Sequence, residues 1–263
     1  MFRTSLIRSG NSITKQLRSS NLNSIIINNF NRTYYSPFHE QEPIVDLTTF
    51  ENKILLKAYE DYVPELGFKN ESVLQAIKDL GYNSDNLKGM FNFTTDSKDL
   101  AIELIFFHLK YQRFKLSDFH EKASTLQTET ERVRYYLGQR LLNNNKIIRH
   151  YSNALAHMIK PSILPLSLQE LHNLSDDITF YAGDQSNDFA WYTKRFSLSN
   201  VFIQSELFML NDYSKDFNNT LQFMNNRLDE VDKAGYIYNS IEEWAIFNGI
   251  STINMIKSQL LRG

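Results

Sequence analysis

The chain has 263 residues, 42% of them hydrophobic, so it can bury a substantial core in one or two domains. It contains no cysteine, which excludes a disulfide framework, a thiolate zinc site and a cysteine nucleophile. The formal net charge of -2 is unevenly distributed along the chain. Residues 1–39 are basic, whereas the remainder is acidic, with 23 basic and 30 acidic residues.

The first predicted element is a targeting segment over residues 1–39. It has no acidic residue, is rich in Ser and Asn, and carries five cations: Arg3, Arg8, Lys15, Arg18 and Arg32. This composition is typical of a mitochondrial transit peptide, and an ordinary disordered tail is the alternative. No apolar run in the chain approaches the ~20 residues that span a bilayer, so we expect any membrane contact to be peripheral.

Helix starts are predicted where a hydroxyl residue is followed three places later by Glu, because such a pair can cap two amides. The pattern occurs at Thr48/Glu51, Thr128/Glu131, Ser167/Glu170 and Ser240/Glu243. Apolar residues keep helical spacing between these starts, and no stretch alternates as a strand does. We therefore predict an all-α fold of about nine or ten helices.

Residues 44–92 are predicted to form a three-helix module of the helix-turn-helix kind, with helices at 48–63, 70–80 and 84–91. The module has five Lys and no Arg against eight acids, which is the wrong sign for holding phosphates. DNA binding, with Asn86 and Lys88 reaching bases, is kept as an alternative.

Residues 96–236 are predicted to form the main helical domain, which ends in a helical hairpin. From Asp188 to Leu210 apolar side chains surround the helix almost completely, which indicates burial on more than one side. After a short loop, apolar residues follow in steps of four and three: Phe217, Leu221, Met224, Leu228 and Val231. We expect this hairpin to form a homodimer interface, and the alternative is an intramolecular core.

Residues 240–262 are predicted to form a C-terminal amphipathic helix. Its wide apolar arc includes Trp244, Phe247, Ile250 and Ile253, and the helix ends in cations. This pattern favours an interfacial membrane anchor over docking on the protein's own domain, although Lys and Arg are few on the polar face.

Motifs for catalysis are missing from the sequence. None of the six histidines follows a Glu by three residues, and there is no His-Glu-x-x-His, glycine-rich phosphate loop or Gly-x-Ser-x-Gly. We therefore predict no metal, no cofactor and no catalytic residue. An unrecognised hydroxylase is the remaining enzyme alternative, and it would need a metal.

The most informative segment spans residues 181–195. Gly183 is predicted to end one helix, and Asp184 or Asp188 can cap the next. Helix capping explains both aspartates but not the aromatic and basic residues after them.

Those residues are Trp191, Tyr192, Lys194 and Arg195. Large aromatics beside cations are typical anchors of protein interfaces, and Arg can also bind a phosphate bidentately. We predict a docking patch with the Trp191 indole on the outside. The alternative is a core tryptophan with solvated cations one turn later.

The string Ala-Gly-Asp-Gln-Ser-Asn-Asp-Phe-Ala-Trp-Tyr-Thr-Lys-Arg over 182–195 resembles the signature of the COQ-nine family, accessory proteins of ubiquinone biosynthesis. The likeness continues through Ser205–Leu210 and the Asp216 and Phe217 pair. It spans about residues 48–235 and is closest from Leu171 onward.

The resemblance implies a tetracycline-repressor-like fold that has lost DNA binding, dimerises through its last two core helices and encloses a lipid-accepting cavity. It implies a mitochondrial protein, peripheral on the matrix side of the inner membrane, that binds phospholipids and isoprenoid quinone intermediates. Such a protein would present polyprenyl quinone intermediates to the demethoxyubiquinone hydroxylase of the ubiquinone-synthesis complex. A DNA-binding transcriptional repressor of the same fold is the alternative function.

Residue by residue, the resemblance assigns Asp188, Trp191 and Tyr192 to the hydroxylase-docking patch, to which we add the neighbouring Lys194. It assigns Arg195 to phospholipid contact. The C-terminal helix matches the family's membrane anchor in position and in Trp244, although its sequence departs strongly.

Overall fold

The computed structural model describes residues 44–82, 91, 93–95, 98–186 and 188–234, together with Ser251, Asn254, Met255 and Ser258. Within these residues every regular element is helical, which confirms the predicted all-α class. The targeting segment and residues 84–90 of the third predicted helix lie outside the described part of the chain. So do the predicted anchor residues Trp244, Phe247, Ile250 and Ile253.

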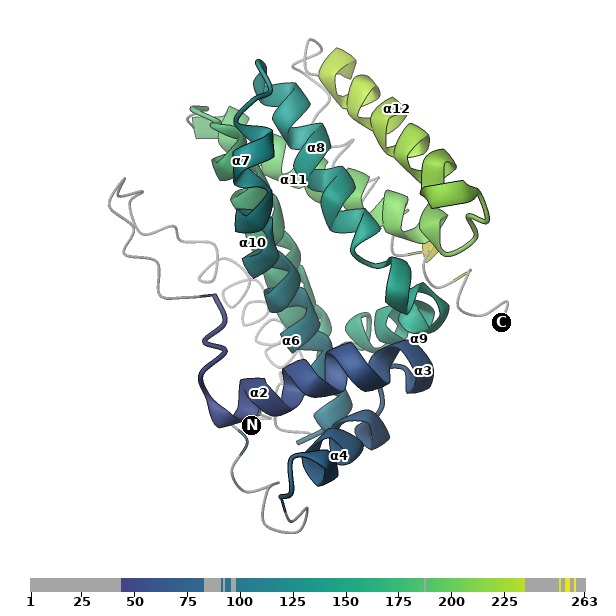
Figure 1. Ribbon diagram of the computed structural model, residues 1–263. Helices are drawn as coiled ribbons and strands as arrows, with labels where there is room; N and C mark the ends of the chain where they lie inside the picture. Colours follow the sequence, from purple (N-terminus) through teal and green to yellow (C-terminus); the bar gives the residue numbers. More distant parts are fainter. Residues whose placement is uncertain are drawn as a thin grey trace, which may run out of the picture. The chain divides into compact units, whose positions relative to one another are not determined.

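The first helical run is continuous from Phe50 to Leu66 (Figure 1). The threonine that caps it is Thr49, one residue after the predicted Thr48, whose hydroxyl instead donates to Asp46. The run ends at Gly67, whose φ of 81° is accessible to glycine at no steric cost. Its parts are α2 (Phe50–Lys57), a π-helical turn (Ala58–Tyr62) and α3 (Val63–Leu66), and α4 (Asn70–Asp79) follows as predicted.

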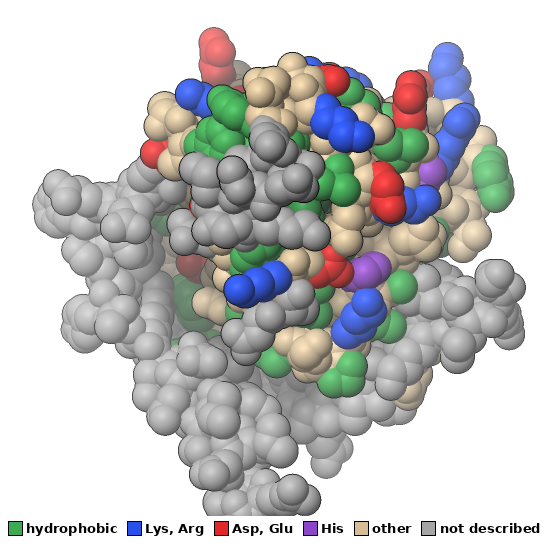
Figure 2. All heavy atoms as spheres, turned by 90° about the horizontal axis from the view of Figure 1, so that it is seen from below, with side chains coloured by type: hydrophobic (Ala, Val, Ile, Leu, Met, Phe, Trp, Pro, Cys, Tyr) green, Lys and Arg blue, Asp and Glu red, His purple; other side chains and the backbone are tan. Residues whose placement is uncertain are grey.

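The described part of this N-terminal module has mixed surface charge. Lys57 lies between two carboxylates, with its ammonium 2.8 Å from Asp61 and 3.8 Å from Asp79. Figure 2 looks at the molecule from below, and its described Lys and Arg side chains lie among acidic and apolar ones. The face in view shows no continuous basic patch among the described side chains, which further weakens the DNA-binding alternative.

Six longer helices and a single-turn helix follow in the described residues. Helix α6 is almost wholly buried, and Asp99 caps it by accepting a hydrogen bond from the Ala101 amide. Helices α11 and α12 pack together as the predicted hairpin, and α10 packs on both α8 and α11 (Figure 1). The bounds are α6 (Leu100–Phe114), α7 (His120–Ala123), α8 (Glu129–Leu142), α9 (Ile148–Met158), α10 (Leu164–Ala182), α11 (Asp188–Met209) and α12 (Asn218–Ala234).

Two of the predicted caps in this region had opposite outcomes. Thr128 and Glu131 form the complete capping box at the start of α8, as predicted. The prediction for Ser167 is wrong, because α10 already begins at Leu164 with a proline in its first turn. Ser167 lies inside the helix, and its hydroxyl donates to the carbonyl of Ile163.

Helix α11 contributes to both of the larger apolar clusters of the described residues, which confirms the prediction that it is buried on more than one side. Leu207 joins the cluster formed by α2, α3, α4, α6 and α9. Leu198, Val201, Phe202 and Met209 join the cluster formed with α8, α10 and α12. Phe196 stays 41% exposed on the same helix. The homodimer remains a prediction.

A fully buried histidine lies in the first of these clusters. Neither ring nitrogen of His108 has a hydrogen-bond partner in the described residues. Its ring packs against Tyr59, Phe68 and Tyr151 at centroid distances of 5.2, 5.5 and 5.7 Å. Burial, and secondarily the charge of Arg140, lowers the pKa of His108 well below its ordinary 6.5.

We expect His108→Phe to make the stability of the fold less sensitive to acid. Below pH 6.5 the unfolded chain takes up a proton at His108 while the folded chain does not, so this group costs stability as pH falls. The advantage of the variant in free energy of unfolding should therefore grow below that pH, approaching about 1.4 kcal/mol per pH unit. Urea denaturation at several pH values measures it, and a constant difference between the two proteins would contradict a neutral buried imidazole.

Candidate functional site

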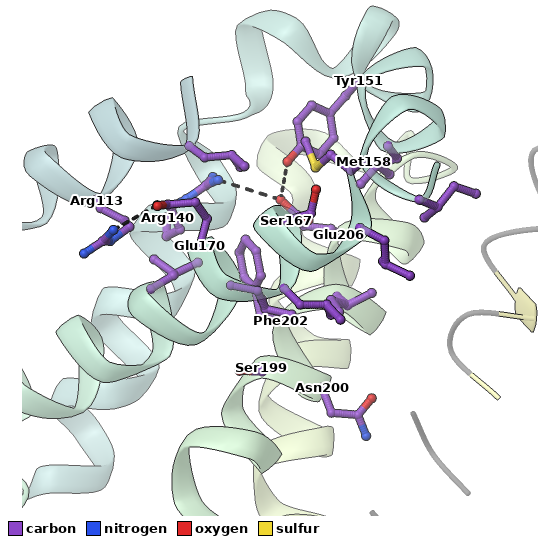
Figure 3. Close-up of a pocket in the computed structure, with 18 of the residues that line it drawn as sticks. Arg113, Arg140, Tyr151, Met158, Ser167, Glu170, Ser199, Asn200, Phe202 and Glu206 are labelled. Carbon is purple, nitrogen blue, oxygen red and sulfur yellow. Dashed lines mark hydrogen bonds and ion pairs between the residues drawn. The ribbon is translucent and has the colours of Figure 1, made fainter. Parts of the chain in front are cut away.

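An apolar cavity of ≈ 180 Å³ lies between α9, α10 and α11, with further side chains from α6 and α8 (Figure 3). Two of its lining residues, Leu168 and Phe196, are 47% and 41% exposed, so the cavity opens beside them. Its volume is close to that of an apolar protein cavity of about 150 Å³ that holds one benzene ring. The apolar lining consists of Leu109, Leu155, Met158, Ile159, Leu164, Leu168, Leu171, Leu174, Phe196, Phe202 and Ile203.

The inner end of the cavity is polar. Arg140 from α8, Tyr151 from α9 and Glu206 from α11 line it and are 0%, 0% and 4% exposed. Oε1 of Glu206 accepts hydrogen bonds from the Tyr151 hydroxyl at 2.8 Å and from Asn144 Nδ2 at 3.0 Å. Asn144 in turn accepts from Nη1 of Arg140 at 2.8 Å. The four side chains thus form one buried network, which we call the inner polar cluster.

The guanidinium of Arg140 is only partly used by this cluster. Its Nη2 lies 3.9 Å from Oε1 of Glu206, close enough for an ion pair but too far for a hydrogen bond. Nε and Nη2 both lack a hydrogen-bond partner among the described residues. The Phe202 ring lies under the guanidinium at 5.1 Å.

Burial dominates the titration of the cluster. It raises the pKa of Glu206, even though the charge of Arg140 and the bonds from Tyr151 and Asn144 act to lower it. Burial, followed by the nearby Glu206, also raises the pKa of Tyr151 well above its usual value. Both groups therefore resist ionisation more than they would in water.

A second arginine, Arg113, lines the cavity, but two carboxylates already pair with its charge. Arg113 from α6 donates to Glu170 at 2.8 Å and to Asp177 at 2.7 Å, both on α10 (Figure 3 shows the pair with Glu170). Among the lining cations, Arg140 is thus the one with unused donors.

The segment over residues 181–195 begins as predicted, because Gly183 ends α10 in the left-handed conformation, with φ 84° and ψ 32°. The buried carboxylate of Asp184 accepts from Ser186, from Lys194 Nζ at 2.8 Å and from Arg195 Nη1 at 3.0 Å. Burial alone would raise the pKa of Asp184, but the hydrogen bonds from Lys194, Ser186 and Arg195 hold it far below its usual range.

The prediction that the Trp191 indole lies on the outside is wrong. The side chain is 7% exposed and packs against His172 at a centroid distance of 5.9 Å. The guanidinium of Arg195 covers its ring at 3.8 Å, and Arg195 is itself 3% exposed. Asp176 on α10 binds Nε of Arg195, so carboxylates on two sides draw the arginine and the indole beneath it inward.

Other members of the predicted patch do face solvent. Tyr192 is 49% exposed and the side chain of Lys194 is 43% exposed. Asp188 is the first residue of α11, and its side chain lies outside the described atoms. The docking role of Asp188, Trp191, Tyr192 and Lys194 remains a prediction.

Phospholipid contact by Arg195 also remains a prediction. In the described conformation two carboxylates already occupy its guanidinium, so a lipid phosphate would have to displace Asp176 or Asp184. The inner polar cluster was not predicted at all from the sequence. Its members lie on three helices and in the turn after α8, and Asn144 and Glu206 are 62 residues apart.

The described residues contain no group of three or more His, Asp or Glu side chains placed to hold a metal ion. None of the helices in the described part combines the length and hydropathy needed to cross a bilayer.

Known proteins resemble the chain over most of its length. The family model named COQ9 matches residues 164–235, which include α10, α11 and α12. The "Ubiquinone biosynthesis protein COQ9, mitochondrial" of Saccharomyces cerevisiae is 33% identical over 248 residues, covering 89% of this chain and 95% of the yeast protein. The Schizosaccharomyces pombe protein of that name is 33% identical over 87% of this chain and 86% of its own length. The human protein is 29% identical over 75% of this chain and 62% of its own length.

Proposed function

The chain belongs to the COQ9 family of ubiquinone biosynthesis proteins, and on this basis we propose that it acts without catalysis as a binding protein for prenylated quinone intermediates. Family membership establishes a role in ubiquinone biosynthesis, and its relatives are named as mitochondrial proteins. The proposal adds what the protein does within that process.

The observation that carries the proposal is the cavity between α9, α10 and α11. Ligand pockets combine an apolar lining with a few placed polar groups, and this cavity has both. Its exposed edge at Leu168 and Phe196 is apolar, so a hydrocarbon chain can lie across it without losing contact with nonpolar surface. A prenylated ring has the same two-part chemistry.

We extend the proposal to delivery of the cargo. The protein would sit peripherally on the matrix side of the mitochondrial inner membrane through residues 240–262 and dimerise through the α11–α12 hairpin in a tetracycline-repressor-like arrangement. Tyr192 and Lys194, with Asp188 beside them, would meet the demethoxyubiquinone hydroxylase. The exposure of Tyr192 and Lys194 supports this assignment, while Trp191 would support the patch from beneath.

The test is mass spectrometry of lipids extracted from protein purified from a ubiquinone-producing host. Wild-type protein is expected to carry prenylated quinone intermediates. Leu168→Trp should reduce the bound isoprenoid at least about five-fold, because the indole narrows the cavity opening, whose tight fit penalises added volume. Leu80→Trp is the matched control, since Leu80 is a similarly exposed leucine, 38%, that does not line the cavity.

Wild-type protein free of isoprenoid would contradict the proposed function. Equal isoprenoid content in the two tryptophan variants would contradict the assignment of this cavity as the binding site. Metal-dependent turnover of a quinone intermediate by the purified protein would favour the hydroxylase alternative.

A further inference from the structure

The inner polar cluster contains donors that the protein itself does not use. Arg140 is 0% exposed, yet Nε and Nη2 have no hydrogen-bond partner among the described residues. Buried polar groups in proteins are nearly always hydrogen-bonded, and a guanidinium offers only donors. An acceptor oxygen entering the cavity would satisfy groups that are otherwise costly to bury.

The size of the cavity limits what can occupy it. At ≈ 180 Å³ it accommodates about one six-membered ring and not a long isoprenoid chain. The apolar edge at Leu168 and Phe196 is the exposed end, whereas Arg140 and Glu206 are the buried end. A ligand with a polar ring and a hydrocarbon tail therefore fits with its ring inward and its tail outward.

The charge of the cluster distinguishes between two kinds of polar head. Glu206 lies 3.9 Å from Nη2 of Arg140, so an anionic phosphate bound there would also meet a carboxylate. A neutral ring oxygen meets no such repulsion. Oε1 of Glu206 already accepts from Tyr151 and Asn144, while Oε2 takes part in neither bond and could accept from a ring hydroxyl.

We propose that the inner polar cluster is the head-group site for an oxygen-substituted ring, phenol or quinone, in which Arg140 donates to a ring oxygen and Glu206 faces a ring hydroxyl. The prenyl chain leaves past Leu168 and Phe196. This inference rests on the proposed function, which requires only that a prenylated intermediate binds, and it adds which residues recognise the head and which way the ligand points.

The experiment compares two conservative variants and two probes. Arg140→Lys keeps the charge beside Glu206 but loses the Nε and Nη2 donors. Arg134→Lys is the matched control, at an arginine of the same helix that does not line the cavity and that pairs with Asp229 and Asp232. The probes are a ubiquinone with a two-isoprene chain and farnesene, an isoprenoid hydrocarbon without a ring. Equilibrium dialysis of full-length protein in detergent gives each Kd.

Arg140→Lys is expected to weaken binding of the ubiquinone probe by about ten-fold or more, since hydrogen bonds from a charged donor are lost. It should change the Kd for farnesene by less than about two-fold, because the apolar lining is intact. Arg134→Lys should change neither Kd. If Arg140→Lys does not fold, the double variant Arg140→Met with Glu206→Met removes both charges at similar side-chain volume. This double variant should also weaken binding of the ubiquinone probe by a larger factor than binding of farnesene.

Two results would overturn the inference while leaving the proposed function intact. One is an unchanged Kd for the ubiquinone probe in Arg140→Lys, and the other is an equal loss for ubiquinone and farnesene, which would show that Arg140 does not select the ring. Wild-type protein that binds neither probe would overturn the proposed function together with the inference.

Discussion

Arg195→Met is expected to lower the free energy of unfolding by about 3–5 kcal/mol, because removing one partner of a buried ion pair leaves the other charge uncompensated. Arg195 is 3% exposed and binds Asp176 and Asp184. The methionine keeps much of the side-chain volume, so most of the lost stability comes from the carboxylates that no longer have the guanidinium as a partner. At about 2–4 °C per kcal/mol for a domain of this size, the melting temperature should fall by roughly 6–20 °C.

Lys194→Met is the matched control for this prediction. Lys194 binds the same carboxylate of Asp184, but its side chain is 43% exposed and the bond is screened by water. Its loss is expected to cost no more than about 1 kcal/mol. Urea denaturation followed by circular dichroism compares the two variants directly.

Equal, small losses in both variants would mean that Arg195 contributes little to stability. Such a result would leave its guanidinium available for the phospholipid contact that the family resemblance implies. A large loss specific to Arg195→Met would instead establish the arginine as a clamp between α10 and α11. Anionic vesicle binding by a Lys194→Met sample would then show whether lipid contact depends on the neighbouring exposed cation.

Local chemistry accounts for the parts of the fold that the sequence predicted well. The Thr128 and Glu131 capping box needs only residues within one turn, and Gly183 needs only its own backbone freedom. The same cap pattern failed at Ser167, because α10 begins three residues earlier at Leu164, and Glu170 is bound by Arg113, 57 residues earlier in the chain. A pattern of neighbouring residues reveals neither the earlier helix start nor the distant partner of the carboxylate.

The candidate site depended still more on distant partners. The segment with Trp191 and Arg195 was recognised from its composition, but its orientation depends on Asp176, 19 residues before Arg195. On the sequence alone, an aromatic beside cations fits a surface anchor as well as a covered ring. The inner polar cluster left no local pattern, because Arg140 and Glu206 are brought together only when α8, α9 and α11 pack.

Trp191→Ala is expected to lower the free energy of unfolding by about 3–5 kcal/mol, as for other large aromatic side chains truncated inside proteins. The indole is 7% exposed and supports the Arg195 guanidinium at 3.8 Å, so both packing and a cation–π contact are lost. Trp191→Phe keeps an aromatic face and should lose less than half as much. A Trp191→Ala protein as stable as wild type would contradict the buried position of the ring.

Tyr192→Ala tests the docking patch without disturbing the core. Tyr192 is 49% exposed, so its truncation should change stability by no more than about 0.5 kcal/mol. If the patch docks the hydroxylase, the same change should weaken their association about ten-fold or more, as expected for an aromatic interface anchor. Tyr213→Ala, at a tyrosine 94% exposed outside the patch, provides the control in a pull-down or calorimetric titration with purified hydroxylase. Tyr192→Ala protein that binds the enzyme as tightly as the control would remove this surface from the delivery mechanism, whereas a selective loss at constant melting temperature would place the contact on the exposed side of α11.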